Sequence, residues 1–306
     1  MAKEHNLDVS IAGFAGTNNV QDAARLKIEN GLAECAMISN FDVSDTYSAV
    51  TRQGKDLVYS GTPHSFDSNG SGYFVEGNYF KQLMPDYSVV ILGTLKAPYL
   101  PMSYTPVNYM TVCSNGVDLF IVENGVVSAF SIPQPQFGLV NGINMQLKTA
   151  ILAAQIVAFY MRRLWYAVGP ALYFSDADNI EQSDVRDDPF VFNKLITMVL
   201  PLDNGIYVGA DKVYWLAGRE PEEMTIPPGS GYDSTVVAGT GIAFDGNIAG
   251  GTGKIGMFTT TDGICLGADN GQVQNLTLNK IAFADGHRGA AIIRKSGDFN
   301  QYISWT

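Results

Sequence analysis

Seven of the Asn-Gly and Asp-Gly pairs between residues 69 and 286 mark predicted hairpin turns, and they constrain the fold more than any other feature of the sequence. Such a pair tolerates the positive φ angles that both central residues of a type I′ hairpin turn require. Apolar runs of four to six residues separate the pairs, which is typical of short strands joined by tight turns. The chain is therefore predicted to be a series of β-hairpins from Leu57 onward. The pairs are Asn69-Gly70, Asn115-Gly116, Asn124-Gly125, Asn204-Gly205, Asp262-Gly263, Asn270-Gly271 and Asp285-Gly286.

Five of these hairpins resemble one another, at residues 72–79, 119–126, 164–171, 205–212 and 263–270. Their starts are 47, 45, 41 and 58 residues apart. A repeat of about 40 to 50 residues with four short strands is typical of one β-propeller blade. The spacing favours an all-β, β-propeller-like fold of five to seven blades over a β-sandwich or jelly roll, which lacks hairpins repeated at one spacing. The longest interval is interpreted as an inserted loop near 220–253, which is rich in Gly, Pro, Ser and Thr.

Four glycines are singled out as hairpin-turn residues: Gly116, Gly205, Gly263 and Gly271. Two of them, Gly205 and Gly263, are expected to need a φ angle that only glycine adopts easily. A bulky residue at either position is therefore expected to disturb a turn.

The composition agrees with a β-rich globular chain. Charged residues make up 16% of the 306, below the roughly 25% of an average soluble domain, and 46% are hydrophobic. We predict a propeller-like domain over residues 51–306, preceded by an N-terminal arm or outer strand segment over residues 1–50. Residues 148–160 are ambiguous between helix and strand, and the β-branched residues favour a strand from Ile156.

No catalytic, metal or cofactor site is predicted. The three histidines lie at a terminus (His5), in a Pro-containing turn (His64) and beside an Asp-Gly turn (His287), and none belongs to a nucleophile motif. The three cysteines are widely spaced in apolar surroundings, which indicates buried free thiols and no structural metal. No signal peptide is expected, and the most apolar stretch, residues 150–161, is too short to cross a bilayer.

Six acidic residues fall within 13 positions: Asp176, Asp178, Glu181, Asp184, Asp187 and Asp188. Paired carboxylates of this kind occur in glycosidases, and acidic loops bind calcium. The ligand order and central glycine of an EF-hand are missing here, so the segment is interpreted as a solvated acidic loop.

Short runs along nearly the whole chain resemble a family of tailed-bacteriophage virion proteins of the tail hub, nozzle or packaged-DNA stabilisation type. The runs are GTNNV at 16–20, YSGTPHS at 59–65, YFVEG at 73–77, SYTPVN at 103–108, SNG at 114–116, RLWYA at 163–167, LYFS at 172–175, GIYVG at 205–209, GICLG at 263–267 and QNLT at 274–277. One departure lies between Pro133 and Ile156, where longer members carry an additional β-rich segment and this chain is expected to have a short link.

The resemblance implies a non-enzymatic structural propeller of the tail or head-to-tail apparatus, located in the virion and assembled in the host cytoplasm. Its implied partners are sister subunits in a ring and other tail, connector or portal proteins, with no cofactor and no membrane insertion. The net charge of −11 argues against binding the DNA backbone and suits a conduit through which DNA passes. The six acids are then candidates for the lining of that conduit or for an interface.

A second hypothesis is a tail-tip propeller that binds or cleaves a host surface glycan or contacts a host receptor. It predicts exposed Tyr, Trp and carboxylate side chains gathered on one face.

Overall fold

The structure is a computed structural model of the whole chain. It describes residues 13–17, 19–21, 26, 28–29, 32–35, 41–43, 49–51, 59–67, 70–131, 133–248, 251–296 and 299–305. Within these residues the regular structure consists of β-strands and one short 3-10 helix, η2 (Pro221–Glu223). The predicted all-β class is confirmed.

Most strands belong to five consecutive antiparallel sheets of three or four strands each, which we call blades 1 to 5. Blade 1 contains β6 (Tyr73–Glu76), β7 (Tyr79–Leu83) and β8 (Val89–Thr94); blade 2 contains β9 (Ser103–Val107), β10 (Met110–Ser114), β11 (Leu119–Glu123) and β12 (Val126–Ser128); blade 3 contains β16 (Ile156–Tyr160), β17 (Arg163–Val168), β18 (Ala171–Phe174) and β20 (Phe190–Val191); blade 4 contains β21 (Met198–Pro201), β22 (Gly205–Gly209) and β23 (Val213–Ala217); blade 5 contains β24 (Ile242–Ile248), β25 (Gly251–Thr260), β26 (Gly263–Gly267) and β27 (Val273–Asn275).

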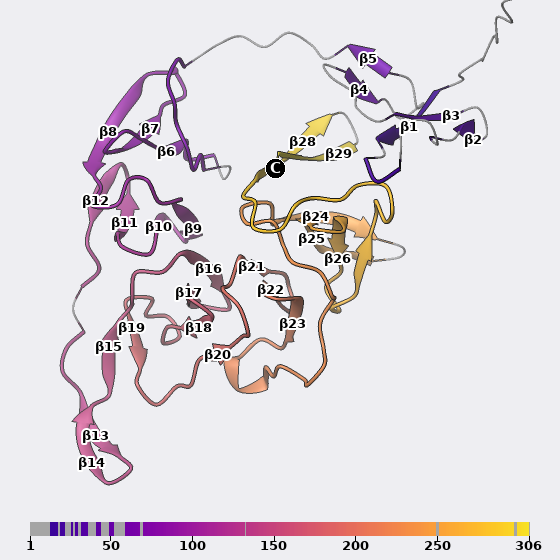
Figure 1. Cartoon of the computed structure of the whole chain (residues 1–306). Coiled ribbons are helices and arrows are strands. Elements are labelled where there is room, and N and C mark those ends of the chain that lie inside the picture. Colours follow the sequence, from indigo (N-terminus) through magenta and orange to yellow (C-terminus); the bar gives the residue numbers. More distant parts are fainter. Residues whose placement is uncertain are drawn as a thin grey trace, which may run out of the picture.

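The blades follow one another around a common centre. The first strand of blade 3, β16, lies against the first strands of both neighbouring blades, β9 and β21, and β21 in turn lies against β24. Figure 1 shows these first strands on the inner side of a curved row of sheets and the last strands on the outer side. This radial arrangement is propeller-like, and five such sheets fall within the predicted range of blades.

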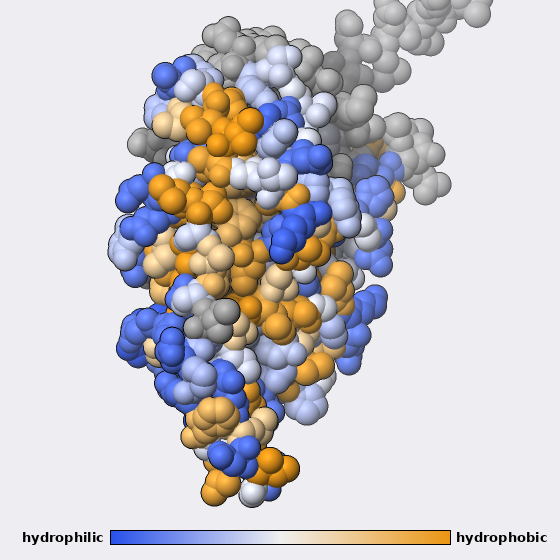
Figure 2. Space-filling view, turned by 90° about the vertical axis from the view of Figure 1, so that its left-hand side faces the viewer, coloured by the Kyte–Doolittle hydropathy of each residue, from blue (hydrophilic) through white to orange (hydrophobic). Residues whose placement is uncertain are grey.

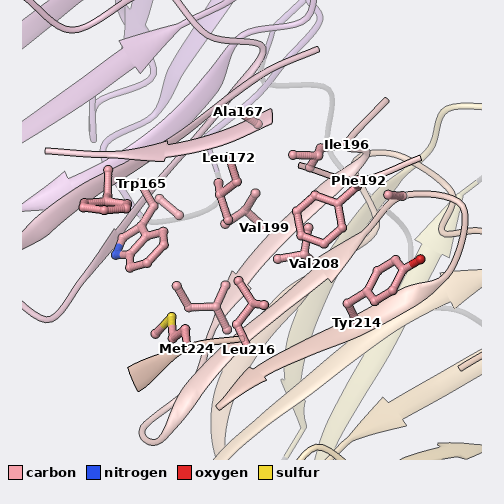
Figure 3. Packing of buried hydrophobic residues seen from close by; sticks show 14 of the residues in the cluster. Trp165, Ala167, Leu172, Phe192, Ile196, Val199, Val208, Tyr214, Leu216 and Met224 are labelled. Carbon is pink, nitrogen blue, oxygen red and sulfur yellow. The ribbon is translucent and has the colours of Figure 1, made fainter. Parts of the chain in front are cut away.

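The hydrophobic core is divided among the gaps between neighbouring blades. Each of four buried clusters draws its side chains from two consecutive sheets. Because side chains alternate along a strand, Leu164 and Tyr166 of β17 face blade 2, whereas Trp165 and Ala167 face blade 4. Figure 3 shows the second of these contacts, where Trp165 and Leu172 of blade 3 meet Val199, Val208 and Leu216 of blade 4. A blade buried on both faces cannot be stable without its neighbours.

The sequence repeats do not occupy equivalent places in the blades. Residues 72–79 begin at the first strand of their blade and residues 164–171 and 205–212 at the second, whereas residues 119–126 and 263–270 begin at the third. The second strands of the five blades begin at Tyr79, Met110, Arg163, Gly205 and Gly251, at intervals of 31, 53, 42 and 46 residues. The 58-residue interval therefore reflects a change of register, and residues 220–253 contain η2, β24 and the start of β25.

The longest interval lies between blades 2 and 3, where the sequence led us to expect a short link. This expectation is wrong, because the segment forms a hairpin of β13 (Phe137–Val140) and β14 (Ile143–Gln146), followed by β15 (Lys148–Ala150). The last of these strands pairs with β19 (Gln182–Asp184), outside the blade sheets. The strand expected from Ile156 is present as β16.

The remaining described strands lie near the two ends of the chain. The N-terminal segment contains β1 (Gly13–Thr17), β2 (Ile28–Glu29), β3 (Leu32–Cys35), β4 (Phe41–Val43) and β5 (Ala49–Thr51). Strands β28 (Ala290–Ser296) and β29 (Phe299–Trp305) form a C-terminal hairpin, and β28 contacts β24 of blade 5. Asn19 and Glu34 reach Lys280 through a hydrogen bond and an ion pair, so described parts of the N-terminal segment touch the C-terminal part of the chain. The exact boundary at residue 50 remains a prediction.

Candidate functional site

The acidic segment of residues 176–188 joins β18 to β20 and includes β19. Four of its six acidic residues bind other groups of the same chain. Asp176 and Asp184 bind Lys148, Asp178 binds Arg162, and Glu181 binds Ser131. In Figure 1, β15 and β19 lie on the outer side of the curved row, whereas β16 lies on its inner side. The structure thus uses much of this segment to connect parts of the chain, and a role in lining a conduit stays a prediction.

A partly buried ion cluster forms the centre of the segment. The ammonium of Lys148 lies 2.7 Å from Oδ2 of Asp176 and 3.0 Å from Oδ2 of Asp184, and Arg186 Nη2 lies 2.6 Å from the same Asp184 oxygen. The side chain of Asp184 is only 6% exposed. Hydrogen bonds from Arg186 and then from Lys148 hold the pKa of Asp184 well below its ordinary value, against the opposing effect of burial. Burial alone would lower the pKa of Lys148, but its bonds to Asp176 and Asp184 raise it.

This cluster holds the base of the β13–β14 hairpin from both sides. Lys148 is the first residue of β15, two positions after the end of β14. Ser131, on the other side of the hairpin, donates its backbone N–H to Glu181 over 3.0 Å and also its hydroxyl. The backbone N–H of Val185 donates to the carbonyl of Leu147 over 2.8 Å. The acidic segment therefore fixes where the hairpin leaves the body of the protein.

Above this base the hairpin is uncharged and largely apolar. No charged residue occurs from position 132 to position 147. Phe137, Leu139 and Ile143 are 66%, 74% and 67% exposed. Figure 1 shows the hairpin projecting from the blades, and Figure 2 shows hydrophobic residues in the projecting tip. An exposed apolar surface held away from the body is typical of an interaction site.

The sequence contains a signal for this hairpin that was not among the seven turn pairs used to predict the fold. Asn141-Gly142 is a further Asn-Gly pair, flanked by FGLV and INMQ. In the structure Asn141 has a φ of 51° and Gly142 a φ of 80°, both positive as a type I′ turn requires. The pair would have predicted a hairpin at this place.

The four glycines predicted at hairpin turns differ in the structural reason for which a glycine is required. Gly116, Gly263 and Gly271 have φ angles of 92°, 134° and 84° in or beside hairpin turns. Gly205, the first residue of β22, is absent from the positive-φ residues, so the expectation of a special φ angle there is wrong. A Cβ at Gly205 would lie 2.4 Å from the carbonyl oxygen of Leu216 and 2.6 Å from the Trp215 ring. A close approach of the neighbouring strand explains this glycine.

The histidines do not form a catalytic arrangement among the described residues. The ring of His64 lies between Ser65 Oγ, 2.9 Å from Nδ1, and the carbonyl oxygen of Pro98, 2.8 Å from Nε2. His287 is exposed, and His5 lies outside the described residues. His64 thus joins two loops of the chain.

A shallow pocket of about 250 Å³ lies beside blade 4. It is lined by Phe192 and Tyr214 together with Asn193, Asp211 and Lys212. Both Tyr214 Oη and Asn193 Nδ2 donate hydrogen bonds to Asp211, over 3.0 Å and 3.1 Å. Burial opposes the shift, but these donors leave the pKa of Asp211 below its ordinary value, so it is a carboxylate at neutral pH.

Cys113 and Cys265 are buried free thiols, as predicted. In the described part of the chain no three His, Cys, Asp or Glu side chains are grouped so as to hold a metal ion. No helix of the described residues is long and apolar enough to span a membrane.

Comparison with known proteins gives a likeness in fold. No protein-family model matches the chain, and no curated protein sequence does. Among solved structures, the chain is similar to a catalytically inactive variant of virginiamycin B lyase from Staphylococcus aureus with quinupristin, at 12% sequence identity and a TM-score of 0.45. The match covers 99% of this chain and 95% of the lyase.

This similar protein is an enzyme, so the prediction that the chain is not an enzyme is contradicted and is withdrawn. At this identity and TM-score the likeness assigns neither a substrate nor a catalytic residue to the chain.

Proposed function

We propose that the chain is a structural component of a tailed-bacteriophage particle, built into a ring of the tail or head-to-tail apparatus. The sequence runs that resemble hub, nozzle and packaged-DNA stabilisation proteins support a place in a tailed-bacteriophage particle. Its location would be the virion, after assembly in the bacterial cytoplasm, and its partners would be sister subunits and neighbouring tail, connector or portal proteins.

The single structural observation that supports an assembly role is the anchored β13–β14 hairpin. Its exposed side chains are uncharged and include the apolar Phe137, Leu139 and Ile143, and its base is held by the Lys148, Asp176 and Asp184 cluster and by Glu181. An uncharged hairpin fixed in this way keeps its contact surface in a defined position, which lowers the entropy lost when another protein binds.

The charge of the chain supports a conduit that DNA passes without being bound. A net charge of −11 repels phosphate within a Debye length of about 8 Å at physiological salt. Binding assays with duplex DNA at low salt test this part of the proposal. We expect no binding at micromolar concentrations, and salt-sensitive micromolar affinity would contradict a conduit.

Electron microscopy of purified particles tests the location. Gold-labelled antibodies against the chain are expected to mark the tail or the head-to-tail region of particles from the phage that encodes it. Antibodies against the major capsid protein serve as the control for access and specificity. Absence of the chain from purified infectious particles would overturn the proposal.

The second candidate function, glycan binding or cleavage at a tail tip, is supported by the pocket beside blade 4. Asn193, Asp211 and Lys212 can exchange hydrogen bonds with sugar hydroxyl groups there, above the buried Phe192 and Tyr214. Binding of host envelope polysaccharide by the wild-type chain, and its loss in Asp211→Asn with retention in Asp285→Asn at an exposed acid away from the pocket, would favour this function. Equal binding by both variants would show that any glycan binds outside this pocket.

A further inference from the structure

The β13–β14 hairpin exposes apolar side chains on both of its faces. Its register pairs Phe137 with Gln146 and Leu139 with Asn144, so these side chains share one face. Val140 and Ile143 form the next pair and lie on the opposite face, together with Met145. An isolated two-stranded hairpin is only marginally stable in water. A partner that covers one or both faces would stabilise it.

A second uncharged surface lies at the outer edge of blade 1. Strand β8 is the last strand of its sheet, so one side of its backbone is unpaired within the described sheet. It contains neither a charged residue nor a proline, and residues 87–95 are all uncharged. Edge strands normally carry charged residues or prolines, which prevent pairing with another chain. Val90 and Ile91 of this strand are exposed, the latter by 57%, and the neighbouring β12 adds the exposed Val126.

The net charge of the chain restricts where two copies can meet. Two copies, each with a net charge of −11, repel one another over most of their surfaces. The hairpin and the β8 edge are both uncharged, so bringing them together buries no unpaired charge. A sister copy therefore supplies what each surface lacks: an apolar cover for the hairpin and a pairing strand for the edge.

The positions of the two surfaces determine the kind of contact. In Figure 1, β8 and the β13–β14 hairpin lie at opposite ends of the same side of the molecule. Figure 2 views that side and shows hydrophobic residues near its upper end and again in the projecting tip. A hairpin of one copy would thus meet β8 of the next copy. Such head-to-tail contacts use two different patches and generate rings or open chains.

We propose that the β13–β14 hairpin of one copy docks on the outer edge of blade 1 of a second copy, along β8 and beside Val126. The inference deepens the proposed function by naming how sister subunits meet, and it rests on that function only for the biological purpose of the assembly. The contact itself follows from the two described surfaces and can be tested on the purified chain alone.

Analytical ultracentrifugation of the full chain at several concentrations measures self-association. The wild-type chain is expected to form oligomers that dissociate on dilution. Leu139→Asp in the hairpin and Ile91→Asp in β8 are each expected to raise the dissociation constant by at least about 100-fold, since each places a charge where an apolar side chain becomes buried. Leu278→Asp, at another exposed leucine outside both surfaces, is the matched control and should associate like the wild type.

Mixing the two variants distinguishes this contact from others. Leu139→Asp retains an intact β8 and Ile91→Asp retains an intact hairpin, so one productive contact remains between them. We expect a dimer of one copy of each variant, and no larger species. A contact of hairpin with hairpin would instead leave Ile91→Asp self-associating like the wild type, with no mixed dimer formed, and would overturn the proposal.

Circular dichroism and the urea midpoint establish that each variant is folded before it is interpreted. Hydrogen exchange then locates the contact: amides of β8 should gain protection as the wild-type concentration rises, and they should not do so in Leu139→Asp. A monomeric wild-type chain at about 100 μM, or association that both Asp variants leave unchanged, would overturn the proposal. Neither result bears on whether the chain is found in the particle, which the microscopy decides separately.

Discussion

Blades 3 and 4 and the β13–β14 hairpin are both built from short antiparallel strands joined by tight turns, yet they obtain their stability in different ways. Between the blades, Trp165, Leu172 and Leu216 are fully buried because two sheets cover them. In the hairpin, Leu139 is 74% exposed, and the ion pairs that hold it lie at the polar base around Lys148 and Asp184. The comparison shows that ion pairs between side chains can hold an element at its base while its apolar surface remains available to a partner.

The largest expected difference between these regions follows from removing an aromatic side chain. Trp165→Ala empties a closed space between blades 3 and 4 and should lower the free energy of unfolding by about 3–5 kcal/mol. Phe137→Ala, in the hairpin, should change it by less than about 0.5 kcal/mol in the monomer. Urea unfolding at low protein concentration measures both. A similar cost for the two substitutions would mean that the hairpin packs against the body.

The ion cluster is expected to matter next. Lys148→Met removes the cation between Asp176 and Asp184 and should lower the free energy of unfolding by about 2–3 kcal/mol, less than for a fully buried pair because Arg186 still neutralises Asp184. Faster amide exchange throughout β13 and β14 should accompany the loss. Lys254→Met, at an exposed and longer ion pair, is the control. Unchanged exchange in the hairpin would show that the cluster does not anchor it.

The contribution of Asp184 should depend on pH. Its folded pKa lies below its ordinary value, so the carboxylate stabilises the fold above the unfolded pKa and loses this effect as the pH falls toward the folded pKa. Asp184→Asn should therefore cost about 1–3 kcal/mol at pH 6 and progressively less below about pH 4. Urea unfolding at several pH values measures the difference from the wild type. A difference that grows on acidification would contradict the assigned direction.

Two turn glycines with similar backbone angles provide a finer comparison. Gly271 in blade 5 has a φ of 84° and Gly142 in the hairpin a φ of 80°. A Cβ at Gly271 would lie 2.4 Å from Cδ1 of Trp215, whereas nothing lies within 4 Å of one at Gly142. Both alanine variants carry about 1 kcal/mol of left-handed strain, and Gly271→Ala should cost at least about 1 kcal/mol more because Trp215 must move. Equal urea midpoints for the two alanine variants would contradict the claim that Trp215 restricts the turn at Gly271.

The smallest effect is expected from an acid of the same segment that lies outside the cluster. Asp178 pairs with Arg162 over 2.7 Å, but both side chains are mostly exposed. Water and salt screen such a pair, so Asp178→Asn should change the free energy of unfolding by less than about 0.5 kcal/mol. Comparing the thermal melts of Asp178→Asn and Lys148→Met tests whether the position of an acid in the segment, more than its charge, determines how much it contributes to stability.

Much of the candidate site could not be predicted from the sequence, for a specific reason. The six acids were recognised as a group, but their partners Ser131 and Lys148 are far from them in the chain and become neighbours only through the pairing of β15 with β19. The hairpin that they hold was predictable from Asn141-Gly142. Its exposure was not, since a flanking pattern such as FGLV also suits a buried strand.

Local patterns in the sequence were enough to predict the all-β class and most of the hairpins, because turn residues and strand alternation act locally along the chain. Only the tertiary structure decided that the repeated hairpins occupy different strands in different blades, that residues 242–248 form a strand, and that the hairpin between blades 2 and 3 projects. These features depend on which apolar faces cover one another. That choice is made between segments some 40 residues apart, so no local pattern contains it.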